Sequence, residues 1–221
     1  MIDPSVLNAM RRDWDARAKA NARHYAATAR TEWSDDDFFA SGAAEVHEIV
    51  QKDLAVISNG RSPSDMRVLE IGCGAGRMTA ALSRLFGYVD AVDVSPEMVD
   101  RARMVLRDCA NVQLYVNNGA DLSMFPSDRF HFAISVVVFQ HIPKRLVVEN
   151  YIKETHRVLC PGSLFKFQLQ GYPIKEEEAD TWVGVGFSEE QMRDIAARHG
   201  FQIKDSTGAG TQYYWLTFVK P

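Results

Sequence analysis

VLEIGCGAGR, the segment Val68–Arg77, reads as an apolar strand that runs into three alternating glycines and then into a helix. Glycine lacks a Cβ atom and tolerates positive φ, so such a turn lets the backbone approach a ligand closely. A dinucleotide-binding turn needs its third glycine at the last position of Gly-x-Gly-x-x-Gly. Here the third glycine, Gly76, comes one residue early, and Arg77 takes the last position. The spacing therefore argues against a pyrophosphate ligand and favours a ligand without phosphate.

The composition sets the class of protein. The chain has 221 residues, of which 46% are hydrophobic and 24% are charged, so one large α/β domain with a full core is expected. A net charge of −4 does not indicate the excess of positive charge that typically attracts nucleic acid. No apolar run approaches the ~20 residues that span a bilayer, and the first residues lack a secretory signal pattern. Three scattered cysteines fit a reducing compartment. We expect a cytoplasmic protein without membrane or nucleic-acid partners.

Strands and helices alternate after residue 60. Apolar strands are expected at 67–71, 88–92, 112–116, 130–138 and 164–169, and helices at 75–86, 96–107 and 143–159. Near-continuous apolar strands that alternate with helices indicate a parallel sheet covered on both faces. The tail differs, because a helix at 188–199 precedes two strands, 201–205 and 211–219, joined by a glycine-rich hairpin. The sequence therefore predicts a doubly wound α/β sheet, mostly parallel, with an antiparallel pair at its end.

The N-terminal part is predicted to be helical. Alanine and arginine dominate residues 5–29, and Ser34 followed by three aspartates predicts a capped helix that runs to about residue 57. Aromatic residues gather here, among them Trp14, Tyr25 and Trp33. We interpret residues 1–44 as a helical cap over the active site, with residues 45–221 as the main domain. A plain amphipathic helix packed on the core is the alternative.

Several motifs now indicate a family. They are VLEIGCGAGRMT at 68–79 with Asp93 beyond it, FQHIP at 139–143, RVLCPG at 157–162, and FSEE at 187–190 with HGF at 199–201. Together and in this order, the motifs resemble class I S-adenosylmethionine-dependent methyltransferases that act on small molecules. The resemblance covers roughly residues 45–221. It implies a seven-stranded sheet whose last strand is inserted antiparallel between the fifth and sixth, and it implies S-adenosylmethionine as cofactor.

The resemblance also implies a cofactor-binding set near the first two strands. Gly72, Gly74 and Gly76 would close the turn against the amino-acid end of the cofactor. Glu70 would hold the ligand's amino group, although a salt bridge or a backbone cap would also explain a carboxylate in an apolar strand. Asp93 would accept two ribose hydroxyls. A helix-capping role for Asp93 is the alternative, but Ser95 already fills that position.

Further cofactor contacts are expected at strand ends. Val94 and Met98 would pack near the adenine, or serve the core alone. Asn118, Gly119 and Ala120 follow the third strand and would read the adenine edge, with a simple turn as the alternative. Asn118 departs from the aspartate common in the family, but its side-chain oxygen still accepts a hydrogen bond. Ser135 and Gln140 would border the methionine part, unless they are ordinary core and loop residues. A second departure is His131, where the family often has aspartate.

Two residues are candidates for catalysis. His141 follows a core strand and precedes Pro143, so it should lie on the ligand rim and take a proton from a hydroxyl or amine. A histidine that only shapes the loop is the alternative. Tyr25 of the expected cap is the second candidate, because a lid that aligns the acceptor and excludes water suits methyl transfer.

These predictions lead to one functional hypothesis. The chain is expected to be an enzyme that transfers a methyl group from S-adenosylmethionine to oxygen or nitrogen of a small-molecule acceptor. No metal-ligand spacing is present, so no metal is expected. A cofactor-holding subunit without chemistry is one alternative, and a nicotinamide dehydrogenase is another, which Arg77 disfavours. The acceptor and the oligomeric state stay open.

Overall fold

The computed structural model describes residues 2–221. Its seven strands follow the order β3-β2-β1-β4-β5-β7-β6, and β7 pairs antiparallel with both β5 and β6. The predicted doubly wound sheet with its antiparallel last strand is thereby confirmed. The chain divides into two compact units, one of residues 11–116 and one of residues 117–221 with the residues up to 10.

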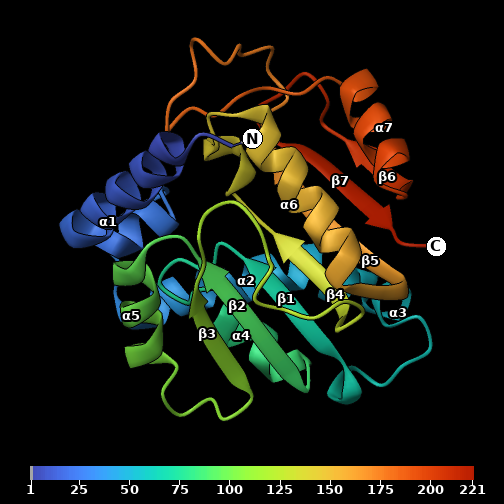
Figure 1. Cartoon of the computed structure of the whole chain (residues 1–221). Helices are drawn as coiled ribbons and strands as arrows, with labels where there is room; N and C mark the ends of the chain where they lie inside the picture. The colour runs from blue at the N-terminus through green and yellow to red at the C-terminus, as the bar shows by residue number, and fades with distance from the viewer. Residues whose placement is uncertain (1) are drawn as a thin grey trace. The chain divides into compact units, whose positions relative to one another are not determined.

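The unit of residues 11–116 carries three parallel strands, β1 Arg67–Ile71, β2 Tyr88–Asp93 and β3 Val112–Val116. Its helices are most of α1 (Pro4–Ala26), α2 (Asp35–Ile49), α3 (Leu54–Ser58), α4 (Thr79–Leu85) and α5 (Pro96–Val105), with 3-10 turns at Gln51–Asp53 and Pro63–Asp65. Helix α5 packs on β2 and β3, and α4 packs on β2 and α2 (Figure 1). The register places Ile71 opposite Val92, so the chain leaves β1 beside Asp93.

Local signals explain where these helices begin. The Ser34 side chain accepts a hydrogen bond from the Asp37 N–H at the start of α2, and the Ser95 side chain accepts one from the Met98 N–H at the start of α5. Both predicted caps are confirmed. Helix α1 is broken at Asn21, where φ is −167° and ψ is 85°, and it ends at Ala26, earlier than expected. Helix α2 ends at Ile49, where a 3-10 turn interrupts the expected run to residue 57.

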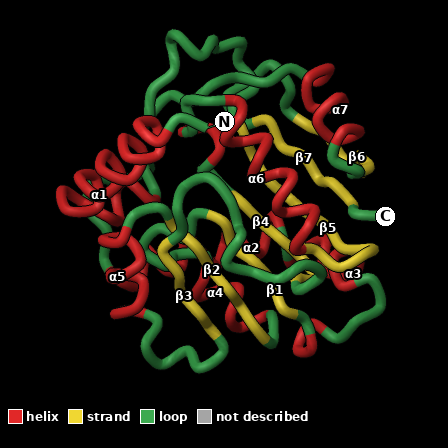
Figure 2. Tube along the Cα trace, viewed as in Figure 1, coloured by secondary structure: helices red, strands yellow, loops and turns green. Residues whose placement is uncertain are grey.

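The unit of residues 117–221 carries the other four strands. They are β4 (Phe130–Ser135), β5 (Leu159–Leu169), β6 (Gln202–Thr207) and β7 (Tyr214–Val219), with helices α6 (Arg145–Val158) and α7 (Glu189–Arg198) and the 3-10 turn η3 (Phe139–His141). Helix α6 packs on β5, and α7 packs on β6. Figure 2 shows a long connection without helix or strand between β5 and α7. This connection lies after the carboxyl end of β5, where open α/β sheets place ligands.

Two expected elements are shorter in the structure. The strand predicted at 130–138 ends at Ser135, because Val137 adopts a left-handed conformation with φ of 55° and the chain then enters η3. The helix predicted from residue 75 begins at Thr79, because the glycine turn extends through Gly76, whose φ is 84°. In both places the chain leaves regular structure at the carboxyl end of a parallel strand.

Candidate functional site

The glycine turn after β1 is tied to the end of β2. Gly72, Gly74 and Gly76 all have positive φ, at 82°, 51° and 84°, which explains why the turn needs glycine at alternate positions. The N–H groups of Gly72 and Cys73 donate to the Val92 carbonyl at 2.8 and 3.0 Å. The turn is therefore held by the neighbouring strand, with its backbone bent for close approach.

Asp93 links the glycine turn to α5. Its Oδ2 accepts from the Gly74 N–H, and its Oδ1 accepts from the Ser95 N–H, each at 2.9 Å. Burial raises the pKa of the Asp93 carboxyl, and backbone donors, among them the Val94 N–H, lower it. A carboxylate has about four acceptor positions, so Asp93 can also accept from a ligand hydroxyl beside these backbone donors.

Glu70 is a buried carboxyl group with one oxygen in use. Its side chain is 5% exposed, and the Thr79 hydroxyl donates to Oε2 at 2.6 Å. Burial raises the pKa of Glu70 to about 7, whereas the Thr79 hydrogen bond and the Arg77 charge lower it. A ligand ammonium group beside this carboxyl would favour its charged form.

Arg77 and Gly76 have structural partners within this unit. The Arg77 guanidinium forms an ion pair with Glu45 of α2, and both side chains are mostly buried. A Cβ atom on Gly76 would lie 2.9 Å from the Leu106 side chain of α5, so this third glycine allows helix packing. The structure thus gives a packing reason for Gly76, whereas a Cβ atom on Gly74 would lie 3.5 Å from the Ala26 side chain, an ordinary contact. A contact of Gly76 with cofactor stays a prediction.

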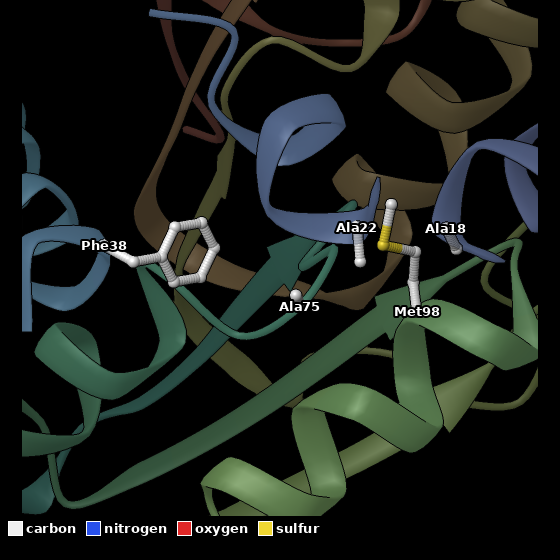
Figure 3. Close-up of a cluster of buried hydrophobic side chains, with 5 residues drawn as sticks. All are labelled: Ala18, Ala22, Phe38, Ala75 and Met98. Carbon is white, nitrogen blue, oxygen red and sulfur yellow. The ribbon is translucent and has the colours of Figure 1, made fainter. Parts of the chain in front are cut away.

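An apolar cluster surrounds the turn. Ala18 and Ala22 of α1, Phe38 of α2, Ala75 and Met98 point toward one another (Figure 3). Trp14 and Tyr25 pack against this cluster as partly buried side chains. Met98 therefore lies close to Ala75 of the glycine turn, and Tyr25 packs against the same cluster. Their contacts with adenine and with an acceptor stay predictions.

Asp15 of α1 is a residue that the sequence analysis did not select. The Ser95 hydroxyl donates to Asp15 Oδ1, which also accepts from the Glu97 N–H at 3.2 Å. Asp15 thus adds a second acceptor at the start of α5, beside the loop that carries Asp93. No local sequence pattern predicts the contact between Asp15 and Ser95, because the two residues lie 80 positions apart in the chain.

In the unit of residues 117–221, a turn after β3 carries Asn118, Gly119 and Ala120. The Asn118 side-chain oxygen accepts from the N–H groups of Ala120 and Asp121, at 2.8 and 3.0 Å. Both lone pairs of this oxygen are thereby used, so the expected adenine contact through it is not available in this geometry. A side-chain hydrogen bond from Asn118 also helps to lower the pKa of the Asp121 carboxyl. The Gly119 N–H donates to Asn117 Oδ1 at 3.1 Å, so the turn is rigidly capped.

A polar network joins Gln140, His141 and Gln168 beyond the end of β4, near the buried Ser135. Ser135, at the strand end, is fully buried, and Gln140 and His141 are 4% and 8% exposed. Gln168 of β5 donates to Gln140 Oε1 at 2.7 Å, and the Gln140 amide nitrogen lies 3.2 Å from His141 Nε2. His141 Nδ1 contacts the Trp182 carbonyl in the long connection. Both ring nitrogens of His141 are engaged, and its role as a base stays a prediction.

Among residues 2–221 no group of three or more histidine, cysteine or acidic side chains is arranged to hold a metal ion. In the same part of the chain, no helix has both the length and the apolar character needed to cross a bilayer. The three cysteines are free thiols.

Comparison with known proteins finds a family model that matches part of the chain. Residues 68–162, from the glycine turn to the start of β5, match the family model of a methyltransferase domain. This segment is similar to a methyltransferase domain. A curated relative of the domain is the ubiquinone biosynthesis O-methyltransferase of Xanthomonas axonopodis pv. citri, 28% identical over 130 residues, which are 58% of this chain and 53% of that protein. The chain spans about half the length of the curated relatives it matches.

Solved structures share the fold of the methyltransferase domain. A SAM-dependent methyltransferase from Aquifex aeolicus aligns with a TM-score of 0.59 and 18% identity, over 86% of this chain and 100% of that one. The DhpI–SAH complex aligns with a TM-score of 0.66 and 16% identity, over 99% and 98% of the two chains. These alignments confirm the predicted Rossmann-like fold, and the domain match supports the predicted resemblance to class I methyltransferases. The first of these neighbours is named as SAM-dependent and the second as a complex with SAH.

Proposed function

We propose that this chain is an enzyme that transfers the methyl group of S-adenosylmethionine to an oxygen or nitrogen atom of a small molecule. The observation that carries the proposal is the turn at Gly72 and Gly74, bent by positive φ and joined to Asp93 by the Gly74 N–H at 2.9 Å. A glycine turn with a carboxylate on the adjacent strand suits a nucleoside without a pyrophosphate. The match to a methyltransferase domain supports the same assignment.

The residues present fit the cofactor. The buried Glu70 carboxyl would face the cofactor's ammonium group, and the Asp93 carboxyl would accept from its ribose hydroxyls. Met98 and Ala75 lie in the apolar cluster beside the turn, where an adenine ring would be desolvated. The bound cofactor supplies a methyl group already activated by its positive sulfur. The chain's own work is then to orient the acceptor and to exclude water.

The acceptor is proposed to be oxygen in the first instance. Relatives that share 28 to 32% identity with this chain are named ubiquinone biosynthesis O-methyltransferases, which supports oxygen over nitrogen. Acceptor choice in this fold depends on segments outside the cofactor turn, so we extend only the acceptor atom and not the ubiquinone pathway to this chain. A cytoplasmic location and residues 1–44 as a lid stay predictions.

The deciding experiment is a transfer assay. The purified chain is incubated with methyl-labelled S-adenosylmethionine and a library of phenols, carboxylates and amines, and S-adenosylhomocysteine release is measured. Acceptor-dependent release supports the proposal. Cofactor binding without release from any compound would instead favour a non-catalytic cofactor-binding subunit, and binding of NAD in place of the sulfonium compound would favour a dehydrogenase.

Asp93 gives a direct test of the cofactor site. Asp93→Asn keeps one acceptor oxygen but loses the charge, so affinity for S-adenosylhomocysteine should fall by about 1–3 kcal/mol, the scale of a hydrogen bond to a charged group. Titration calorimetry measures this, with exposed Asp100→Asn on α5 as the matched control. Unchanged affinity in Asp93→Asn would remove the ribose assignment.

A further inference from the structure

The orientation of the Gln168 carboxamide is fixed by the backbone. Its Oε1 accepts from the Val137 N–H at 3.0 Å, and its Nε2 donates to the carbonyls of Leu169 and Gln212 at 3.0 and 3.1 Å. A backbone N–H only donates and a backbone carbonyl only accepts, so the amide cannot be flipped without losing all three bonds. Gln168 is fully buried, which makes such a loss costly.

The fixed Gln168 determines the orientation of Gln140. The atom of Gln140 that lies 2.7 Å from Gln168 Nε2 must be the oxygen, because this amide nitrogen only donates, with its two hydrogens shared among three acceptor oxygens. The Gln140 nitrogen therefore faces His141 Nε2 at 3.2 Å and donates to it. It follows that Nε2 of His141 carries a lone pair and no proton.

The contact of the other ring nitrogen, Nδ1, independently indicates the same protonation state of His141. His141 Nδ1 lies against the carbonyl oxygen of Trp182, and a carbonyl accepts only from a protonated nitrogen. The neutral Nδ1–H tautomer satisfies both contacts at once. A proton added at Nε2 would face the donor of Gln140, which Gln168 prevents from turning.

The chain of hydrogen bonds joins two segments near the ends of β4 and β5. Beside the His141 contact, the N–H groups of Gly184 and Val185 donate to the carbonyls of Gln140 and Ile142 at 2.7 and 3.0 Å. Gly184 has no room for a side chain, since a Cβ atom there would lie 2.6 Å from the Gln140 carbonyl oxygen. The long connection is therefore closely attached to η3 at this point.

The ring of Trp182 covers the histidine. The two rings lie 5.1 Å apart between centroids with an interplanar angle of 30°. Asp180 fixes the local backbone, because its Oδ1 accepts from the N–H groups of Trp182 and Val183, both at 2.7 Å. The turn that Asp180 stabilises therefore holds the Trp182 carbonyl toward His141.

We propose that His141 is a positioning residue that latches the connection of residues 170–187 onto η3 through its Nδ1–H, and that it is not the general base. This proposal rests on the proposed function, since it assigns to the same enzyme how its acceptor-side connection is held. The strained Val137, with φ of 55°, is held by the same chain through Gln168. The network therefore fixes both segments that leave the carboxyl ends of β4 and β5.

The first test is spectroscopic and needs no acceptor. Long-range ¹H–¹⁵N spectra of the full chain, assigned with His141→Asn, report which ring nitrogen of His141 carries the proton. The expected result is the Nδ1–H tautomer, both with and without S-adenosylhomocysteine. A predominant Nε2–H tautomer would overturn the proposal, whether or not the chain proves to be a methyltransferase.

The second test separates a latch from a base. Asparagine places its amide nitrogen where Nδ1 of histidine lies, so His141→Asn keeps the bond to Trp182 but has no basic group. We expect His141→Ala to raise the acceptor KM about tenfold, the equivalent of one lost hydrogen bond and its ordering. His141→Asn should recover most of this loss and keep kcat within about threefold of the wild type. Loss of a general base would lower kcat about 10²- to 10⁴-fold in both variants.

Controls distinguish the possible failures. His47→Asn, on the exposed side of α2, should change neither kinetics nor spectra. Hydrogen exchange of residues 182–185 should quicken in His141→Ala and stay near the wild-type rate in His141→Asn. Equal loss of kcat in both His141 variants would overturn the latch. Absence of turnover in the wild type would count against the proposed function alone, because tautomer and exchange are still measured.

Discussion

Glu70, near the end of β1, has a buried carboxyl group whose pKa is raised from 4.5 to about 7. Burial is the main cause, and Asp93 and Glu45 add to it, while Thr79 and Arg77 oppose it. Because the folded state holds the proton more tightly than the unfolded chain, Glu70 contributes stability at low pH. This contribution is lost as pH rises from about 4.5 to 7.

Glu70→Gln tests this at the scale of one residue. Glutamine stays neutral and still accepts from Thr79, so it should remove the pH-dependent loss. A shift of about 2.5 pKa units corresponds to about 3 kcal/mol. Without cofactor, the unfolding free energy of the variant minus that of the wild type should rise by up to about 3 kcal/mol from pH 5 to pH 8. Urea unfolding at both pH values measures it, with exposed Glu48→Gln as the control. Parallel pH profiles for wild type and variant would show that Glu70 titrates normally.

At the scale of elements, α2 holds the glycine turn by close approach. A Cβ atom on Gly42 would lie 2.3 Å from the Arg77 carbonyl oxygen. Gly42→Ala should therefore destabilise the fold by about 1–3 kcal/mol through overpacking and lower cofactor affinity by shifting the turn. Gly210→Ala is the matched control, since nothing lies within 4 Å of its Cβ position and only its φ of 75° is strained. If both variants lose no more than about 1 kcal/mol in urea unfolding, α2 does not constrain the turn.

The second prediction at the scale of elements concerns the contact between α1 and α5. Asp15→Ala removes the acceptor of the Ser95 hydroxyl and the Glu97 N–H, so stability should fall by about 1 kcal/mol, as for a lost helix cap. Hydrogen exchange in residues 14–26 should quicken at the same time. Asp108→Ala, 90% exposed at its side chain, is the control. Unchanged protection of α1 in Asp15→Ala would mean that the apolar cluster alone holds the helix.

At the scale of the whole molecule, cofactor binding should stabilise the fold by mass action. S-adenosylhomocysteine at a hundred times its Kd adds ~2.7 kcal/mol, which corresponds to a Tm rise of roughly 5 to 10 °C for a chain of this size. Differential scanning fluorimetry measures the rise, with NAD at the same concentration as the control. An equal or larger shift with NAD would favour the dehydrogenase alternative, which the place of Arg77 disfavours.

Sequence patterns determined much of the molecule because the interactions behind them are local. Strands β1 and β3 lie where the apolar runs predict, and Ser34 and Ser95 cap their helices through bonds within three residues. The glycine spacing of the turn follows from backbone conformations that each residue adopts on its own, namely positive φ. These features need no knowledge of distant partners, so the family and the class of ligand could be inferred from the chain alone.

Tertiary structure decided which side chains meet across long separations. Asp15 and Ser95 lie 80 residues apart, Arg77 and Glu45 lie 32 apart, and the donor role of His141 depends on Trp182, 41 residues away. The sequence could name His141 as a histidine at the rim but could not assign its tautomer. That assignment comes from the order of donors and acceptors that packing places around a buried ring, because each partner in the chain fixes the orientation of the next.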